Sequence, residues 1–411
     1  MTKRVVVIGA GAAGSMAAIF AARAGADTVL VERTQDGGRK ILISGGGRCN
    51  VLPAHVDESR FVTDSSPNVL RKMVRAWPLA EQRAFFEQTL GIPLVEEVES
   101  AKLFPASHRA RDVRDALLAY ARAQGVQMRM QTRVTGLAPS DHGWDVSMDN
   151  DVPLHGDAVI VATGGLSVPN TGSDGAGLSM LAALGHTMHP TYAALTPLTA
   201  NHSAFNELSG VSLTVSLTAR SDERSAQATG GFLFTHHGYS GPSVLDVSHV
   251  MVRDRTARTS VAKVHVQWTT LDDAAWELAL KPHGARTVTG ALRAVLPDRL
   301  AAALLAQAGV DPTRPLSELR REERRALIDT LVRGELPCHG DEGYKKAEVT
   351  GGGVALSEVN PRTMESRRHP GLFLCGEVLD AFGPIGGYNF LWAWATGRAA
   401  GIGAADLSRE P

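Results

Sequence analysis

Three glycines and one glutamate near the start of the chain have the types and spacing needed to hold a phosphorylated ligand. Gly9, Gly11 and Gly14 form a GxGxxG pattern directly after the branched apolar run 5–8. The first glycine permits a tight turn, the second lets a pyrophosphate approach the backbone, and the third lets a helix pack closely against a sheet. Glu32 follows at close to the roughly 20 residues expected for an acid that binds ribose hydroxyls. The pattern therefore predicts a dinucleotide site.

The elements that must position these residues can be read from the same stretch. The apolar runs 5–8 and 28–31 predict buried parallel strands, and the small and apolar residues 15–24 predict a helix that Gly25 ends. Phosphates would lie at the N-terminus of that helix, where free N–H groups and the macrodipole favour negative charge.

A second glycine-rich stretch, residues 37–50, indicates backbone that can press against a flat or phosphorylated ligand. Arg39, Lys40 and Arg48 in this stretch could neutralise a pyrophosphate, although solvated cations on a surface loop are the alternative. We interpret Cys49 as a packed thiol and not as a nucleophile, because nothing in its neighbourhood indicates a lowered pKa.

Two further predictions concern the nucleotide. Strand 158–161 runs into Ala162, Thr163 and Gly164, and strands of a doubly wound sheet end at the ligand crevice. We expect these residues near the ligand, although an ordinary glycine turn would leave the same pattern. Val134 stands where backbone could contact an adenine.

The C-terminal part of the chain decides which dinucleotide is expected. A strand at 371–375 ends in Gly376 and Glu377, whose carboxylate could accept hydrogen bonds from a ribityl chain. The glycine-rich loop 383–389 then opens a helix at 390–404. A helix N-terminus stabilises the negative charge of a reduced flavin by about 0.3–1 kcal/mol when exposed and up to about 2 kcal/mol when partly buried. Reduction of a nicotinamide removes a positive charge and gains nothing comparable, so FAD fits better than NAD.

Composition sets the class of protein. The chain has 411 residues, 44% of them hydrophobic and 21% charged, which predicts a globular protein of more than one domain. The net charge of −1 argues against nucleic acid or an anionic membrane as partner. Three separated cysteines without a CxxC pair predict a reducing, cytoplasmic compartment and no metal site. The uncharged run 5–22 resembles a membrane span, but its glycine spacing favours the nucleotide fold.

The middle of the chain has another character. From about residue 195 to residue 268, short alternating runs predict antiparallel β-structure, as a barrel or sandwich. His236 or His237 in this region could transfer a proton near neutral pH, although loop histidines are more often only hydrogen-bonded. Residues 272–335 have a helical, charged pattern with both signs mixed, which is typical of solvated helix faces.

Several segments together carry a resemblance to a known family. They are Gly38-Arg39-Lys40 through Ser44-Gly45-Gly46-Gly47-Arg48-Cys49-Asn50, Phe104-Pro105, Phe234-Thr235-His236 with Ser240-Gly241-Pro242, Val349-Thr350-Gly351-Gly352-Gly353-Val354, and Gly376-Glu377-Val378-Leu379-Asp380 through Gly386-Gly387-Tyr388-Asn389. The chain resembles the BaiN/YhiN-like (HI0933-like) family of bacterial FAD-dependent flavoproteins of the glutathione-reductase superfamily. The resemblance implies an α/β fold with a doubly wound, Rossmann-like FAD-binding domain from residues 1–190 and 346–411. An antiparallel β-barrel at 191–271 and a helical segment at 272–345 would be inserted.

The resemblance also implies a set of cofactor-binding residues. The pyrophosphate would meet Gly9–Gly14, the ribose Glu32, the adenine Val134, the ribityl chain Glu377, and the flavin pyrimidine edge Gly387–Asn389. The full set is Gly9, Ala10, Gly11, Ala12, Ala13, Gly14, Glu32, Arg33, Arg39, Lys40, Ser44, Gly45, Gly47, Arg48, Cys49, Asn50, Val134, Ala162, Thr163, Gly164, Gly376, Glu377, Gly386, Gly387, Tyr388, Asn389 and Phe390. Val51 replaces a common threonine and Trp392 stands in the final helix where a glutamine is common, which puts transfer of a relative's substrate in doubt.

The expected function is that of an FAD-dependent oxidoreductase moving a hydride between flavin N5 and a small organic substrate. An NAD(P)H-driven reductase of a conjugated enone is one form of it, and an amine-type oxidase using oxygen is the alternative. NAD(P)H would bind transiently, because a second nucleotide domain is not evident. Candidates for substrate contact are His236, Tyr239, Tyr388 and Trp392. A flavoprotein that modifies tRNA, a non-catalytic flavin sensor and an NAD-dependent dehydrogenase remain further hypotheses; substrate and oligomeric state are not predicted.

Overall fold

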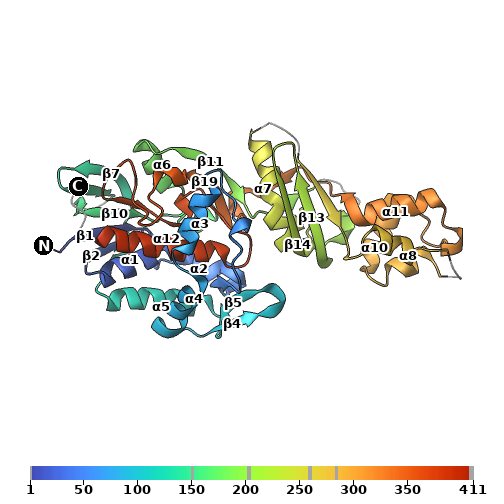
Figure 1. Cartoon of the computed structure of the whole chain (residues 1–411), viewed down its shortest axis with the longest axis horizontal. Helices are drawn as coiled ribbons and strands as arrows, with labels where there is room; N and C mark the ends of the chain where they lie inside the picture. Colours follow the sequence, from blue (N-terminus) through green and yellow to red (C-terminus); the bar gives the residue numbers. More distant parts are fainter. Residues whose placement is uncertain (1, 150–151, 201–204, 258–261, 283–285, 407–411) are drawn as a thin grey trace. The chain divides into compact units, whose positions relative to one another are not determined.

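The chain forms two compact units. The computed structural model describes residues 2–149, 152–200, 205–257, 262–282 and 286–406. Unit 1 comprises residues 1–191 and 349–411, and unit 2 comprises residues 192–348 (Figure 1). The chain therefore leaves unit 1 after residue 191, builds unit 2, and returns at residue 349 to complete unit 1.

A five-stranded parallel sheet lies at the centre of unit 1, in the order β20-β10-β1-β2-β6. Its strands are β1 (Arg4–Ile8), β2 (Asp27–Val31), β6 (Gln127–Arg129), β10 (Ala158–Val161) and β20 (Leu372–Leu374). The apolar runs of β1 and β10 are almost fully buried, as expected for parallel strands covered on both faces. The prediction of a Rossmann-type α/β fold with a parallel sheet is confirmed.

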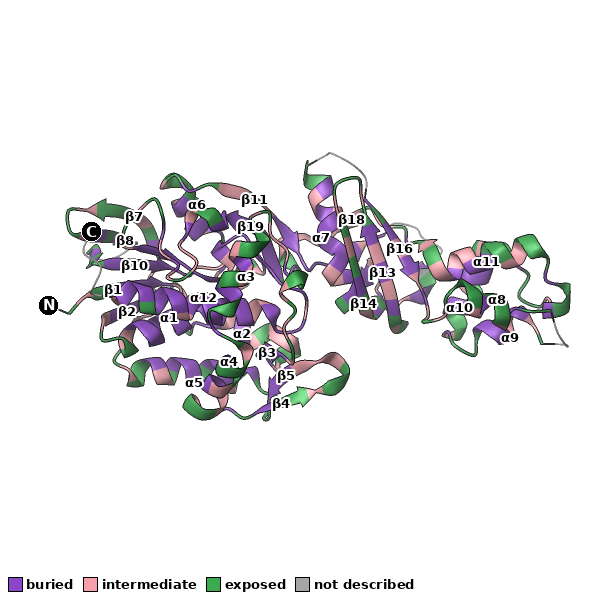
Figure 2. Cartoon of the chain, in the orientation of Figure 1, coloured by how far each residue is buried: buried purple, intermediate pink, exposed green. Residues whose placement is uncertain are grey.

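The helices of unit 1 surround this sheet. They are α1 (Ala12–Arg23), α2 (Arg39–Ile43), α3 (Pro67–Arg75), α4 (Leu79–Ala84), α5 (Ala110–Ala123), α6 (Ala176–Ala183) and α12 (Tyr388–Ala405). Small residues let α12 lie against α1: a Cβ on Gly397 would stand 2.4 Å from the Ala13 carbonyl oxygen, and one on Gly401 would stand 2.3 Å from that of Ala17. Both helices are buried for most of their length (Figure 2). The first and last helices of unit 1 are thus one packed layer.

Three smaller sheets complete unit 1. One is antiparallel in the order β7-β8-β9, another is antiparallel in the order β3-β5-β4, and β11 pairs with β19. Their bounds are β3 (Leu52–Pro53), β4 (Leu94–Glu97), β5 (Lys102–Pro105), β7 (Val134–Ser140), β8 (Gly143–Met148), β9 (Leu154–Gly156), β11 (Met188–Ala194) and β19 (Val349–Val354).

Unit 2 contains a seven-stranded antiparallel sheet in the order β17-β16-β13-β14-β15-β12-β18. Its strands are β12 (Leu198–Thr199), β13 (Ser212–Arg220), β14 (Ser225–Phe234), β15 (Gly238–Ser240), β16 (Lys263–Gln267), β17 (Gly334–Glu335) and β18 (Gly340–Asp341). Helix α7 (Pro242–Ala257) packs against β13 and β14.

The predicted barrel is not confirmed. Residues 336–339 join the edge strands β17 and β18, so the sheet must curl, yet no ladder pairs these two strands within the described residues of unit 2. Closure would require that pairing. Burial of Val244, Val247 and Val250 on α7 gives the sheet a helix as its packing partner, so its apolar face is covered without closure.

Within the described residues of unit 2, four helices lie between β16 and β17 in the chain. They are α8 (Asp273–Ala279), α9 (Val288–Leu292), α10 (Asp298–Ala308) and α11 (Arg321–Arg333). Their buried faces join the core of the sheet, which is a second hydrophobic cluster separate from that of unit 1. Each unit therefore has its own core.

Candidate functional site

The first glycine loop of unit 1 is packed tightly at two glycines and open at the third. A Cβ on Gly9, whose φ is +101°, would stand 2.6 Å from the Ala162 carbonyl oxygen, and one on Gly14 would stand 1.8 Å from that of Gly9. A Cβ on Gly11 would meet no atom of the described residues within 4 Å. Within the described residues, α1 also begins without a side-chain cap, and no acid stands in its first turn. The loop therefore offers open space and unpaired N–H donors, which suit a pyrophosphate.

Glu32 lies under this loop and is 8% exposed. Its Oε2 accepts a hydrogen bond from Ala10 N at 2.7 Å, and its Oε1 accepts from Thr34 N and Oγ1, each at 2.7 Å. A carboxylate has about four acceptor positions, so one remains after these three bonds. Glu32 therefore anchors the glycine loop through Ala10 N. Its contact with a ribose stays a prediction.

Three of the predicted cations are already paired with acids. Arg33, Arg39 and Arg48 lie at the surface, and their partners are Asp174, Asp36 at 2.8 Å and Glu97 at 2.9 Å. The Arg48 guanidinium also lies 4.2 Å from the centroid of the Phe104 ring. The side-chain bond from Arg39 lowers the pKa of Asp36 despite partial burial. Each arginine would have to leave or share its acid to contact a phosphate.

The loop that follows, Ser44 to Asn50, is a strained turn. Gly45 and Gly47 have φ of +55° and +83°, and Cys49 has φ of +60°, which is uncommon for a residue with a side chain. Cys49 N donates to Ser44 O at 3.0 Å. Burial raises the pKa of the Cys49 thiol to about 12. The thiol is therefore protonated at neutral pH, as expected for a packed residue.

A network around Glu377 joins three parts of unit 1. Lys40 Nζ donates to Glu377 Oε2 at 2.7 Å and to Ser167 Oγ at 2.6 Å. Glu377 Oε1 accepts from Ser167 Oγ at 2.8 Å and from Thr350 N at 2.9 Å. Burial alone would raise the pKa of Glu377, but the Lys40 ammonium and the hydroxyl and amide donors lower it overall. Glu377 is thus held as a carboxylate, directed by three donors, Lys40 Nζ, Ser167 Oγ and Thr350 N.

Close backbone approach fixes this network in place. A Cβ on Gly165 would stand 2.3 Å from Thr350 Oγ1 and 2.8 Å from Glu377 Oε1. Thr350 Oγ1 accepts from Leu166 N at 2.7 Å and from Ser167 N at 3.1 Å. Sequence reasoning missed Ser167 and Thr350 as site residues; the glycine run beside each was the only signal.

The end of β10 meets the first glycine loop, as the strand order requires. Ala162 N donates to Ile8 O at 2.9 Å, and the hydroxyl of Thr163 is buried without a hydrogen-bond partner among the described residues. Gly164 has φ of +75°. Val134 is buried and starts β7 opposite Met148. The structure thus brings 162–164 to the loop at Gly9, and the adenine contact of Val134 stays a prediction.

The second glycine loop is organised by the amide of Asn389. Gly383 N donates to Asn389 Oδ1, and Asn389 Nδ2 donates to Gly383 O, each at 2.9 Å. Gly387 has φ of +92°, and a Cβ there would stand 2.4 Å from the carbonyl carbon of Leu52. Among the described residues, no side chain caps α12 and its first turn carries no acid. Two helices of unit 1 therefore begin with free N–H donors.

Three aromatic residues of α12 have structural contacts. Tyr388 donates its hydroxyl to His55 O and accepts from Asp57 N, each at 3.3 Å. The Phe390 ring stacks on Trp394 with centroids 5.3 Å apart. Trp392 is 2% exposed and donates its indole N–H to Gly376 O at 3.1 Å. Trp392 thereby positions the Gly376–Glu377 turn from the helix side.

The remaining candidates belong to unit 2. His236 and His237 are exposed in the turn between β14 and β15. Tyr239 is 1% exposed and its ring contacts those of Phe232 and Phe234. The histidines are free to contact a ligand from unit 2, whereas Tyr239 belongs to its core.

The residues of unit 1 fit a long dinucleotide with a flavin. An open glycine loop, two helix starts and two directed carboxylates come from both ends of the chain, and the Thr163 hydroxyl is orphaned beside them. Among the described residues, no cluster of three or more His, Cys, Asp or Glu could hold a metal ion. No helix in the described ranges is long and apolar enough to cross a membrane.

Comparison with known proteins agrees with this geometry. A family model, the HI0933-like protein Rossmann domain, matches residues 3–403. A ribosomal RNA dihydrouridine synthase of Escherichia coli (strain K12) is 32% identical over 98% of this chain and 97% of its own length. A 3-dehydro-bile acid delta(4,6)-reductase of Clostridium scindens is 32% identical over 98% of this chain and 99% of its own.

A solved structure shows the same fold. The 3-ketosteroid delta1-dehydrogenase of Sterolibacterium denitrificans, in complex with 1,4-androstadiene-3,17-dione, superposes with a TM-score of 0.55. The alignment covers 98% of this chain and all of that one at 12% identity. The family match and the two near-full-length relatives, together with the flavin-type site, settle the class: the chain belongs to the HI0933-like protein family and is an FAD-dependent oxidoreductase.

Proposed function

We propose that this flavoenzyme saturates a C=C bond conjugated to a carbonyl group, with NAD(P)H as transient electron donor. One observation carries the proposal: two relatives of equal identity have names that share this chemistry. A dihydrouridine synthase saturates the C=C bond of a uracil ring, and a delta(4,6)-reductase saturates C=C bonds of a steroid. Bound FAD would supply the hydride from N5.

The protein's own residues would then stabilise charge and fix geometry. The free N–H groups at the start of α12 would face the pyrimidine edge of the flavin, where reduction places negative charge. The double hydrogen bond between Asn389 and Gly383 would keep that loop in place. Glu377, kept ionised by Lys40, would accept hydrogen bonds from the ribityl hydroxyls.

Two carriers of the conjugated bond follow from the relatives. A free small enone is our first candidate, because the chain has a net charge of −1 and unit 2 carries as many acidic as basic residues. Nucleic-acid binding relies on a basic surface, which this balance does not supply. A uracil ring within ribosomal RNA is the second candidate, favoured by the name of the Escherichia coli relative.

An anaerobic spectrum tests both steps. NADH and then NADPH are added to the FAD-loaded protein, and loss of the flavin band would identify the donor. The reduced protein then receives a 4-en-3-one steroid or unmodified ribosomal RNA in separate samples. Recovery of the band with the steroid supports the small enone, and recovery with RNA, together with dihydrouridine found by mass spectrometry, supports the second candidate. The proposal would be overturned in favour of an oxidase by two results together. Neither NADH nor NADPH would bleach the flavin band, whereas an amine would bleach it and would yield peroxide in air.

Two variants locate the proton donor. Tyr388→Phe removes the hydroxyl of the first residue of α12, and His236→Gln removes an exposed imidazole of unit 2. We expect the responsible variant to be reduced by NAD(P)H at the wild-type rate and to reoxidise at least tenfold more slowly with substrate. Tyr120→Phe, in the half-buried Tyr120 of α5, is the matched control.

A further inference from the structure

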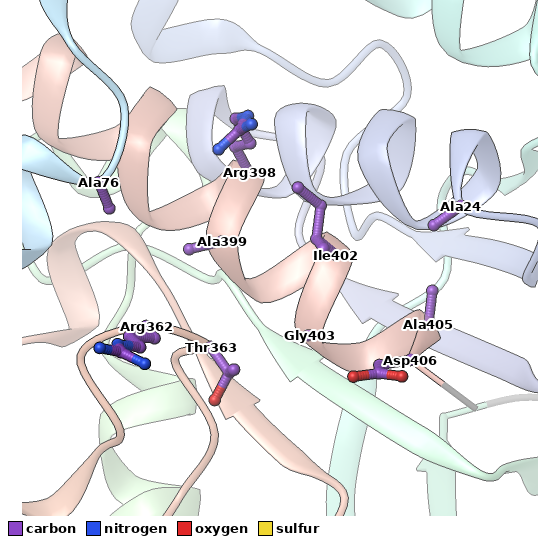
Figure 3. A pocket seen from close by; sticks show the side chains of 10 residues that line it. All are labelled: Ala24, Ala76, Arg362, Thr363, Arg398, Ala399, Ile402, Gly403, Ala405 and Asp406. Atoms are coloured by element: carbon purple, nitrogen blue, oxygen red, sulfur yellow. The ribbon is translucent and has the colours of Figure 1, made fainter. Parts of the chain in front are cut away.

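A second hollow lies on unit 1, at the end of α12 opposite the glycine loop. It encloses about 620 Å³ (Figure 3). Its lining residues are Ala24, Ala76, Arg362, Thr363, Arg398, Ala399, Ile402, Gly403, Ala405 and Asp406. At 1.5 Å per residue, Ile402 lies roughly 20 Å along the helix from Gly387. The volume is typical of a small-molecule site, and none of these residues belongs to the predicted flavin site.

Two guanidinium groups in this pocket have no acidic partner. Neither Arg362 nor Arg398 donates a side-chain hydrogen bond or forms an ion pair within the described part of the chain, although most arginines of unit 1 do. Burial lowers the pKa of Arg398 although Glu81 opposes the change. A half-buried cation without a partner is costly, and an anion supplied from outside would remove that cost.

The Arg398 guanidinium is held in one place by rings. It lies 5.4 Å from the centroid of Phe20 and 5.3 Å from that of Trp77. Both distances are within the range of a cation–π contact. Two ring contacts restrict the guanidinium before any ligand binds, which lowers the entropic cost of binding.

The second arginine is brought close by backbone packing. A Cβ on Gly403 would stand 2.7 Å from Thr363 O, so the loop that carries Arg362 lies directly on α12. Figure 3 shows Arg362 and Arg398 on either side of Ala399. The apolar wall continues along α12 to Ile402, which is 41% exposed. A cationic end and an apolar wall thus adjoin.

The opposite end of the pocket carries charges of both signs. Asp406 and the C-termini of α1 and α12, at Ala24 and Ala405, lie there, and Lys3 Nζ donates to Asp406 O at 3.3 Å. The negative partial charge of a helix C-terminus falls off within the last turn. Arg398 is nearly two turns before Ala405, so its end of the pocket stays positive and is where an anionic head would bind.

We propose that this pocket binds a small amphipathic anion, a carboxylate or phosphate monoester on a short alkyl body. The anionic head contacts Arg398, and the alkyl body covers Ala399 and Ile402. Arg362, on the other side of Ala399, adds to the positive charge of the pocket.

Calorimetric titration of the FAD-loaded protein tests this site. Hexanoate and hexyl phosphate are the probes, and their difference identifies the preferred head; hexyltrimethylammonium is the matched cation. We expect saturable one-to-one binding of an anion and none of the cation. Arg398→Met should weaken binding at least tenfold, and Ala76→Phe should block it from another wall. Arg23→Met is the control, because Arg23 also lies over Phe20, at 5.2 Å, but does not line the pocket.

The readout is binding alone, so it is independent of the reaction proposed above. Each variant is first checked for an unchanged flavin spectrum and melting temperature. The proposal is overturned if neither anion saturates, if the alkylammonium binds equally, or if Arg23→Met loses as much affinity as Arg398→Met. Should Arg398→Met fail to fold, Ala76→Phe and Arg362→Met decide the outcome by the same comparison.

Discussion

Two glutamates that follow strands of the same parallel sheet are held in opposite ways. Glu32 follows β2 and accepts only from neutral donors, the amide of Ala10 and the amide and hydroxyl of Thr34. Glu377 follows β20 and contacts the Lys40 ammonium. Glu32 is buried and Glu377 is partly buried near the predicted cofactor site. The two carboxylates thus differ in what holds them, neutral donors for one and a cation for the other.

The difference indicates different tasks. Glu32 fixes the backbone of the first glycine loop, which is near it in the chain, and its carboxylate accepts hydrogen bonds from backbone amides and a hydroxyl. Glu377 joins residues hundreds of positions apart, and its charge is balanced by a cation. Loss of one neutral donor costs the fold the free energy of one hydrogen bond. Loss of the cation costs more, because it leaves a partly buried carboxylate without its ion-pair partner. The following experiments exploit that contrast.

The largest effect is expected from Lys40→Met. It leaves Glu377 with neutral donors only, as Glu32 has, and should lower the free energy of unfolding by about 3 kcal/mol and weaken FAD binding. Urea unfolding of the FAD-free protein measures the first. Arg39→Met, which breaks an exposed pair with Asp36, should cost less than about 1 kcal/mol. Equal losses in the two variants would remove the distinction between the acids.

A smaller effect is expected from Glu32→Gln. The new amide would direct its NH₂ group toward an N–H donor that the Glu32 carboxylate now accepts from. The resulting clash of donors should lower the free energy of unfolding by about 1–3 kcal/mol. FAD affinity should fall as well, because Ala10 loses its anchor. Glu87→Gln, at a surface pair with Arg83, is the control and should change neither quantity measurably. Wild-type FAD affinity in Glu32→Gln would contradict a role in the loop.

Acid titration separates the two glutamates further. The pKa of Glu377 lies below its ordinary value of 4.5 in the folded protein. Its contribution to stability is therefore complete above pH 4.5 and is lost as the pH falls from there toward the folded pKa. Subtracting the unfolding profile of Glu377→Gln from that of the wild type should show a loss confined to this range. A difference independent of pH would contradict the lowered pKa.

The smallest effect is expected from His186. Its own titration also changes stability with pH, so it has to be separated from the contribution of Glu377. Burial lowers its pKa from 6.5, although the bond to Leu181 O opposes this. The unfolded chain binds the proton more tightly, so stability falls as the pH drops below 6.5. His186→Asn should flatten the profile between that pH and the range of Glu377, whereas His142→Asn at the surface should not. An unchanged slope in His186→Asn would assign the loss to another group.

The sequence predicted local features well, because local chemistry dictates them. The glycine spacing at 9–14 requires a turn, a strand and a helix in order, and β1, α1 and β2 follow it. The barrel is not confirmed, for a physical reason: alternation shows which face of a strand is buried but not whether the edges of a sheet pair. Burial under α7 covered that face instead.

Partners distant in the chain could not be predicted. That Lys40 and Arg48 could neutralise a pyrophosphate stays a prediction, and the sequence did not indicate that Lys40 contacts Glu377 or that Arg48 contacts Glu97. The glycines before Ser167 were the only signal of its role, because its hydroxyl lies between Lys40 and Glu377 only in the folded chain.

By itself, the sequence determined the cofactor class, because a dinucleotide is held by backbone N–H groups that glycines expose at fixed spacing. It also determined the parallel sheet, because long apolar runs must be covered on both faces. Only the tertiary structure decided how each charge is balanced. That balance depends on which side chains meet when distant segments of unit 1 fold together, as Lys40 and Glu377 do. Separation along the chain carries no information about such a contact.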